Sequence, residues 1–329
     1  MPVARLVATL PAPLDPSTAD EPEVRRLAGR TLLVQRGNAE VAVGDRRFPA
    51  PWPRRWGSVA VAPDGDVVVF AGTHALRAVD SAGAVRWELR HGCWSDAMCD
   101  VVHTSFEEYA DDPDHRYPSH GSAAFSPDGR LVWAHVRTDD HEDEPEEWLV
   151  LDASDGTVLA RVPTGTVASA SYHCPHPDPA LMGLTIAEGE EDSPVLWGHW
   201  DGEELTVRHL PESILLDVSP SGERFLTADL DMRGINLHLT ADDTQLGLLR
   251  TGEVVWGFQG AFPWESAAVV GIDEGEHWLI DLATMTADGP ITYPVAPAGA
   301  ALSAGPALPA GPGVWATASR DAVHLWELG

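Results

Sequence analysis

Short apolar runs separated by turn residues recur along the whole chain. In three places an apolar run leads into a turn of the form Pro-x-Gly and a second apolar run follows it, at Val61–Gly65, Phe125–Gly129 and Val218–Gly222. Proline presets φ for such a turn, and glycine accepts a positive φ. Looser versions of the same turn contain Pro177, Pro263 and Pro309. The pattern predicts pairs of short strands joined by tight turns.

The spacing of these turns predicts a repeat. The prolines at 63, 127, 177, 220, 263 and 309 are separated by 64, 50, 43, 43 and 46 residues. A propeller blade of four short strands has a period of about 40–45 residues. Runs such as Val67–Phe70 are apolar throughout, which is typical of a strand buried on both faces between blades. We therefore expect an all-β chain of repeated antiparallel blades.

The last repeat resembles a unit of the WD-repeat β-propeller family, in the degenerate form of bacterial members. In that family a Ser, an Asp and a Trp join a structural hydrogen-bond network with a His from the start of the blade. Ser319, Asp321 and Trp326 match this pattern, whereas no His stands near 298–302. The resemblance implies a scaffold for binding and no particular activity, because one fold hosts many functions.

The repeats account for nearly the whole chain. Six units extend from Trp56 to Gly329, and Glu23–Pro51 supplies a seventh. The last unit stops after its third strand, which leaves Val3–Leu10 available as its fourth. We expect a single domain over residues 1–329, a closed β-propeller of about seven four-stranded blades, with the N-terminal strand completing the last blade so that no edge stays unpaired.

Two polar stretches exceed the repeat length, an insertion loop at 93–118 and an acidic hairpin at 139–147. The repeat continues beyond each of them. We therefore expect both to protrude as loops from the scaffold, and we expect the many carboxylates of the insertion loop to be solvated.

Composition excludes several function classes. The formal net charge is −30 at pH 7, and all 21 basic residues are Arg. Without Lys there is no Schiff-base chemistry and no P-loop. The charge argues against nucleic acid and anionic membranes as partners, and no apolar run approaches the ~18 residues of a membrane span. The three Cys are too few for a disulfide framework. We expect a soluble cytoplasmic protein.

The insertion loop contains a candidate metal site. His91, Cys93, Cys99 and His103 lie within thirteen positions, and His115 follows in the same loop. Zinc prefers four nitrogen or sulfur ligands in a tetrahedral array, which a Cys₂His₂ set provides. Their spacing matches no recognised finger or ribbon, so ordinary packing of the two Cys is the alternative. Zinc is the one cofactor that the sequence suggests.

Aromatic and imidazole side chains supply candidate partner-binding residues. Thirteen Trp stand against four Tyr, and those that recur in register with the repeat are assigned to packing between blades. Surface recognition of a peptide or a sugar remains open for the Trp outside that register, together with several His. The candidates are Trp94, His120, His173, His176, Trp197 and Trp200.

The leading hypothesis is a non-enzymatic scaffold that binds a protein or peptide partner. A chain of charge −30 steers cations towards it, so we expect a basic contact surface on the partner. No catalytic residue is predicted, because the sequence neighbours of Cys174, His173 among them, point to the opposite strand face and provide no base, and because no Gly-x-Ser-x-Gly elbow occurs. The alternative is an enzyme or a metal-dependent ligand-binding propeller that uses the His and Cys of 91–120 at the channel mouth.

Overall fold

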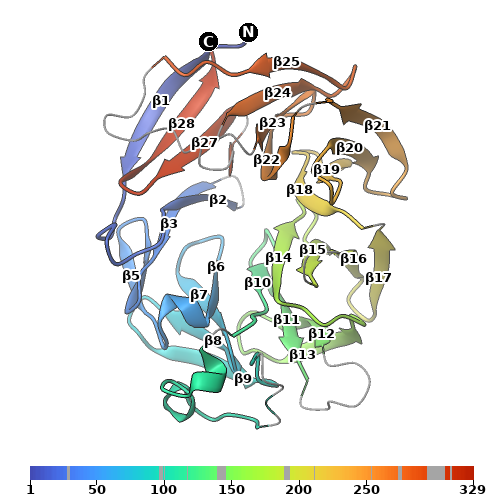
Figure 1. The fold of residues 1–329 in the computed structure, drawn as a ribbon. Helices are drawn as coiled ribbons and strands as arrows, with labels where there is room; N and C mark the ends of the chain where they lie inside the picture. The colour runs from blue at the N-terminus through green and yellow to red at the C-terminus, as the bar shows by residue number, and fades with distance from the viewer. Residues whose placement is uncertain are drawn as a thin grey trace. The chain divides into compact units, whose positions relative to one another are not determined.

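The computed structural model describes residues 1–27, 30–95, 99, 101–116, 118–138, 146–188, 193–210, 212–252, 254–272, 276–294, 308–311 and 313–329. Their strands form seven four-stranded antiparallel sheets (Figure 1), and the helical segments among them are single 3₁₀ turns. The fold is therefore all-β, with the seven blades of a β-propeller, as the turn spacing predicts. None of the helical turns in these ranges is long and apolar enough to cross a bilayer.

The chain divides into two compact units, and the first comprises Met1–Gln35 and Glu212–Gly329. Two of its sheets have their strands in chain order, and a third takes its strands from both ends of the chain in the order β1-β28-β27-β26. The strands are β1 (Ala4–Pro11), β2 (Glu23–Leu27), β3 (Arg30–Arg36), β18 (Ile214–Val218), β19 (Arg224–Ala228), β20 (Gly234–Leu239), β21 (Gln245–Arg250), β22 (Trp256–Trp264), β23 (Ala267–Ile272), β24 (His277–Asp281), β25 (Thr286–Pro290), β26 (Leu308–Gly311), β27 (Val314–Ser319) and β28 (Ala322–Leu328).

The second unit is Arg36–Pro211. It contains three complete sheets with their strands in chain order, and β4 and β5 belong to the sheet β2-β3-β4-β5 that the sequence predicts as the seventh blade. Its elements are β4 (Glu40–Val43), β5 (Arg46–Pro49), η1 (Arg54–Trp56), β6 (Gly57–Val61), β7 (Val67–Gly72), β8 (Ala75–Asp80), β9 (Val85–Arg90), η2 (Phe106–Glu108), η3 (Pro113–His115), β10 (Ala123–Phe125), β11 (Leu131–Arg137), β12 (Glu146–Asp152), β13 (Val158–Pro163), β14 (Ala170–Pro175), β15 (Leu181–Ala187), β16 (Val195–Trp200) and β17 (Leu205–Leu210).

The Pro-x-Gly turns form as the sequence predicts. Each joins the first and second strands of a blade, and the glycines have φ values of 71° at Gly65, 73° at Gly129 and 79° at Gly222. In each turn the glycine N–H donates to the carbonyl three residues earlier, as from Gly65 to Ala62 at 2.8 Å. Only glycine adopts this left-handed conformation without steric cost. The local chemistry of these three positions therefore fixes where each hairpin reverses.

The N-terminal strand completes the last blade. β1 pairs antiparallel with β28, in a register that runs from Ala4 opposite Leu328 to Pro11 opposite Ala322, and the two ends of the chain lie together in Figure 1. Within that blade the Trp326 indole N–H donates to Thr317 Oγ1 at 2.9 Å. The pairing confirms the predicted role of the N-terminal run, and it satisfies the backbone edge that β28 would otherwise expose.

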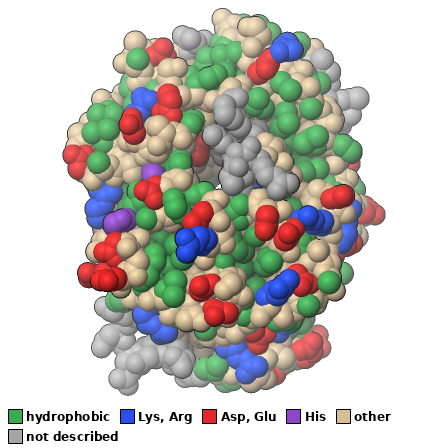
Figure 2. All heavy atoms as spheres, turned by 180° about the vertical axis from the view of Figure 1, so that it is seen from behind, with side chains coloured by type: hydrophobic (Ala, Val, Ile, Leu, Met, Phe, Trp, Pro, Cys, Tyr) green, Lys and Arg blue, Asp and Glu red, His purple; other side chains and the backbone are tan. Residues whose placement is uncertain are grey.

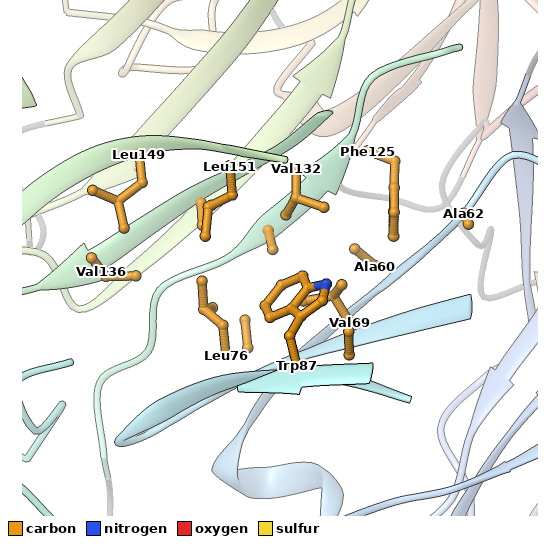
Figure 3. Packing of buried hydrophobic residues seen from close by; sticks show 14 residues of the cluster. Ala60, Ala62, Val69, Leu76, Trp87, Phe125, Val132, Val136, Leu149 and Leu151 are labelled. Atoms are coloured by element: carbon orange, nitrogen blue, oxygen red, sulfur yellow. The ribbon is translucent and has the colours of Figure 1, made fainter. Parts of the chain in front are cut away.

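Apolar side chains fill the space between neighbouring blades. In the second unit, Trp87 of β9 packs in a cluster with residues of the sheets β6–β9 and β10–β13. Figure 3 shows its ring between the two sets of side chains, close to Val69 of its own blade and facing Val132 and Leu151 of the next. The indole N–H donates to Ala153 O at 3.0 Å. The buried aromatic ring therefore contributes packing and one satisfied hydrogen bond.

The acidic hairpin differs from its predicted form. Residues 139–145 lie outside the described part of the chain, whereas Glu146 and Glu147 belong to β12. The Glu146 side chain is 0% exposed and lies 3.2 Å from His135 Nε2, which is equally buried. It accepts hydrogen bonds from Thr166 Oγ1 and Ala168 N, both at 2.6 Å. The expectation of a protruding loop is wrong for Glu146, which is buried in β12, because a buried carboxylate with these donors is stable.

Candidate metal centre

The insertion connects β9 to β10, entirely within the second unit, and it lies beside β8 and β9 in Figure 1. Its described residues contain the two 3₁₀ turns η2 and η3. The Asp112 carboxylate caps η3 by accepting the Asp114 N–H at 3.0 Å, and Pro113 occupies the first position of that turn. A capping Asp followed by Pro is the usual start of a helical turn. This turn brings His115 back towards the start of the insertion.

The first residues of the insertion are fixed to the blades by backbone hydrogen bonds. Gly92 N donates to Arg137 O and Trp94 N donates to Thr73 O, both at 2.9 Å. A Cβ atom on Gly92 would lie 1.9 Å from Thr138 O, so no other residue fits this approach. The Arg137 guanidinium donates to Cys93 O at 3.3 Å. Cys93 therefore has a backbone position set by the scaffold.

Four side chains of the insertion converge. One potential ligand atom from each of Cys93, Cys99, His103 and His115 lies within 4.8 Å of the others. Cys93 Sγ is 3.3 Å from His115 Nε2, and Cys99 Sγ is 3.3 Å from His103 Nε2. Cys93, His103 and His115 are buried, and Cys99 is partly buried. We call these four residues the Cys₂His₂ cluster.

Each histidine of the cluster is held by a carboxylate at its other nitrogen. His103 Nδ1 lies 3.1 Å from Glu108 Oε2, and His115 Nδ1 lies 3.2 Å from Asp112 Oδ2. Glu108 also accepts from the Thr104 hydroxyl, which orients it. A carboxylate at Nδ1 favours the tautomer with its proton on that nitrogen. Both Nε2 atoms then direct a lone pair at the sulfur atoms.

The Tyr109 ring packs against both histidines of the cluster. The Tyr109 ring stacks on His115 with ring centroids 5.1 Å apart and lies 4.8 Å from His103. Its hydroxyl is 2.6 Å from His74 Nδ1, in the turn between β7 and β8. Trp56 contacts the same ring edge-on. These contacts hold the two imidazoles against the blade.

Burial controls the protonation of the groups near the cluster. Loss of solvation, with a smaller effect of the neighbouring Cys99 thiol, raises the pKa of Cys93 to about 12. In the absence of a cation, Cys93 is a neutral thiol at pH 7 and a poor nucleophile. Burial also lowers the pKa of His91 to about 4. Neither group has the protonation behaviour of a general acid or base at neutral pH.

The structure brings together three of the four residues that the sequence suggests as zinc ligands, and it places His115 beside them in the position expected for His91. His91 Nδ1 lies 2.8 Å from Gly92 O, and its backbone N–H donates to His74 O. His91 therefore packs in the blade, outside the cluster. Linear spacing favours His91 because it is nearer in sequence, whereas the η3 turn makes His115 nearer in space.

Two candidate partner-binding histidines, His120 and His173, lie close to the first strands of their blades. His120 is partly buried, and its backbone N–H donates to Ser169 O at 3.2 Å. His173 accepts the Trp148 indole N–H at Nε2 (3.0 Å) and is 2.8 Å from Ser122 Oγ at Nδ1. Both ring nitrogens of His173 are therefore used within the scaffold, which leaves no ring nitrogen for a partner.

The remaining candidates form part of the core. Trp94 and Trp197 are buried, and Trp200 is half-buried against the apolar cluster that contains Trp94. His176 is buried, accepts the Asp178 N–H at 2.9 Å and contacts Trp197 edge-on. The surface role suggested for Trp94 and Trp197 is corrected by their burial: Trp94 packs in an apolar cluster, and the Trp197 ring contacts His176 of its own blade.

Sequence reasoning did not identify the carboxylates that orient the cluster. Asp112 and Glu108 look like members of a solvated acidic run, since both stand among other carboxylates. The available signal is the spacing from Asp112 to His115, which a helical turn converts into contact. No protein-family model matches the chain, and no curated protein sequence matches it.

Proposed function

We propose that this protein is a non-enzymatic binding scaffold that recognises a basic protein or peptide segment through its insertion. The observation that carries the proposal is the exposed side of Val101–Asp114. Val101 and Val102 are 54% and 44% exposed, and Glu107, Asp111 and Asp114 are exposed beside the buried rings of the same segment. An anchored segment that presents apolar and acidic side chains together fits a partner with apolar and basic ones.

The charge distribution supports the insertion as the contact region. On the face shown in Figure 2, acidic side chains are interspersed with arginines, so that face has no single-sign patch among its described side chains. Among the described residues of the insertion there are several acidic side chains and one basic residue, the exposed Arg116. Hydrogen bonds from its own backbone and from Ser105 lower the pKa of Glu107, which keeps it charged at neutral pH. The field of a protein with net charge −30 then assists association with a cation.

The enzyme alternative has weaker support. A catalytic zinc site has three protein ligands and an open position for water, whereas four protein donors converge here. A nucleophilic cysteine needs a lowered pKa, and the pKa of Cys93 is raised. The four-donor geometry favours a structural role for the cluster over a catalytic one.

We also infer a distant relation to WD-repeat propellers and a cytoplasmic location. Trp326, which matches the Trp of the family network, donates a hydrogen bond to Thr317 Oγ1, although Ser319, which matches the Ser, instead donates to Ala322 O. Cys93, Cys99 and Cys174 form no disulfide, as is usual in a reducing compartment.

The test uses two synthetic fluorescent peptides, one alternating Lys with Leu and one alternating Glu with Leu. The triple variant Glu107→Gln, Asp111→Asn and Asp114→Asn should weaken binding of the Lys peptide by about 10–100-fold, since each exposed charge pair contributes about 0.5–1 kcal/mol. Fluorescence anisotropy at low and high salt measures the affinity. The Glu peptide should bind neither the wild-type protein nor the triple variant.

The matched control removes three exposed carboxylates elsewhere, by Glu203→Gln, Glu223→Gln and Glu276→Gln. This control removes as much negative charge as the insertion variant does but leaves the insertion intact, so it should alter the affinity for the Lys peptide by less than about twofold. Equal losses in the two triple variants would mean that only the overall charge attracts the peptide. That result, or equal binding of both peptides, would refute recognition by the insertion.

A further inference from the structure

Two thiols and two imidazoles converge in a loop that has little apolar core of its own. We propose that the Cys₂His₂ cluster binds one Zn²⁺ ion, with Cys93, Cys99, His103 and His115 as its four ligands, and that the ion fixes the insertion to the scaffold. The site goes beyond the proposed partner binding and does not depend on it, because metal content is measured in the absence of any partner.

The distances fit a tetrahedral zinc site. Zinc bonds of about 2.3 Å to sulfur and about 2.0–2.1 Å to nitrogen place neighbouring ligand atoms about 3.3–3.8 Å apart. Both Cys–His pairs stand at 3.3 Å, and the four atoms lie within 4.8 Å of one another. Binding therefore requires the longest separations to shorten by about 1 Å, which rotation of a side chain such as that of the partly buried Cys99 supplies.

The orientation of the imidazoles points to a metal more specifically than their proximity does. Both histidines direct Nε2 at a sulfur atom and Nδ1 at a carboxylate, Glu108 for His103 and Asp112 for His115. A histidine that binds a metal commonly donates its other N–H to a carboxylate, which fixes the tautomer and the ring. The same arrangement occurs at both histidines, with Glu108 supplied by η2 and Asp112 by the N-cap of η3, so it is found twice at separate places in the insertion.

The donor set selects the ion. Calcium and magnesium prefer oxygen ligands, whereas two sulfur and two nitrogen atoms in a tetrahedral array are typical of zinc. All four positions are occupied by protein atoms, so the ion has no open position for water and is structural. Two thiolates balance the charge of the dication, which makes the buried site neutral overall.

The position of the site explains what the ion does. Cys93 is held by the blade through the bonds of its neighbours to Thr73 and Arg137, whereas His103 and His115 lie in the irregular part of the insertion. A metal bond between these two groups closes the insertion onto the scaffold, and the energy of metal binding then stabilises the fold of the loop.

The first test measures metal in protein purified without a polyhistidine tag, incubated with zinc sulfate and then gel-filtered. We expect about one zinc per chain. Cys99→Ser and His115→Asn should each lower the zinc content at least about fivefold, and Cys174→Ser, at the cysteine outside the cluster, should leave it unchanged. Asp112→Asn should keep the ion but weaken its affinity about 10–100-fold, which competition with a chelator measures.

A second test needs no variant. Cobalt sulfate added to the metal-free wild-type protein should give the intense visible bands of tetrahedral Co²⁺ and a thiolate-to-metal charge-transfer band in the near ultraviolet. The proposal is overturned if folded wild-type protein holds no zinc and gives no such bands. It is also overturned if the ligand variants retain zinc as the wild type does, or if Cys93 and Cys99 form a disulfide in reducing buffer.

Discussion

The buried histidines of the blades and those of the insertion differ in what their ring nitrogens contact. His173 of β14 uses both nitrogens within the scaffold, one with the Trp148 indole N–H and one with the Ser122 hydroxyl. His103 and His115 use only Nδ1 on a carboxylate and direct Nε2 at a thiol. The residue type is the same, and the three differ little in exposure, since His103 and His115 are buried and His173 is half-buried. The contact of the second nitrogen therefore separates His173, which is used in packing, from the two histidines that we propose as metal ligands.

The contrast also separates two sources of stability. The blades are stabilised by apolar packing and internal hydrogen bonds, such as those around Trp87. The insertion contains two single 3₁₀ turns and the Cys₂His₂ cluster. Variants in the blades should therefore lower the free energy of unfolding whether or not zinc is present, and three such variants test this in order of decreasing effect.

The largest effect is expected for His173→Ala. Its loss leaves the Trp148 N–H without its acceptor and creates a cavity, which together lower the free energy of unfolding by about 2–4 kcal/mol. Urea unfolding at pH 7, with and without zinc, measures the loss, and zinc content should stay at the wild-type level. His199→Ala, at an exposed histidine of β16, is the control and should cost less than about 0.5 kcal/mol. A loss that disappears without zinc would erase the distinction between the two regions.

A smaller effect is expected for Gly156→Ala, in the turn after β12. Gly156 has φ of 74°, and a Cβ atom there would lie 2.7 Å from Trp87 Cδ2. We expect the free energy of unfolding to fall by about 2–3 kcal/mol, from backbone strain and from displacement of the indole. Gly165 has φ of 68° with nothing within 4 Å of its Cβ position. Gly165→Ala should therefore cost only the strain, about 1 kcal/mol, and equal losses would show that the Trp87 contact is unimportant.

The smallest effect is a pH dependence carried by His173. Burial, with a minor effect of His135, lowers the pKa of His173 to about 3 in the folded protein, against about 6.5 in an unfolded chain. Above pH 6.5 neither state is protonated, so the contribution is fully present. Below that value only the unfolded state binds the proton, and the free energy of unfolding falls by up to about 1.4 kcal/mol per pH unit.

The variant His173→Asn isolates this contribution. It is less stable than the wild type at pH 7 because it loses hydrogen bonds, but it has no imidazole to protonate. The difference between the two proteins in urea unfolding should therefore narrow between pH 7 and pH 5. A constant difference over that range would mean that His173 titrates normally in the folded state.

Features that depend on neighbours in sequence could be predicted. The turns at Gly65, Gly129 and Gly222 form because each glycine adopts positive φ two positions after a proline, and their spacing alone indicates the blades. The pairing of β1 with β28 follows from counting strands, since a blade with three strands leaves an edge to be filled.

Features that depend on contacts between distant segments could not be predicted from the sequence. His115 replaces His91 in the cluster because η3 reverses the chain, and an irregular loop has no periodicity from which such a reversal can be computed. Glu146 stands in an acidic run and is nevertheless buried, since Thr166 and Ala168 of another loop donate to it. These hydrogen bonds from Thr166 and Ala168 to Glu146 exist only once the strands have folded into the blade.

The pairing of β1 with β28 has a consequence for biosynthesis. The two strands are separated by nearly the whole chain, and a ribosome adds about 5–20 residues per second. β1 therefore emerges before β28 and waits tens of seconds for it. During that interval its hydrogen-bonding edge is open to other chains, so the nascent protein is most prone to aggregation before its last blade is translated.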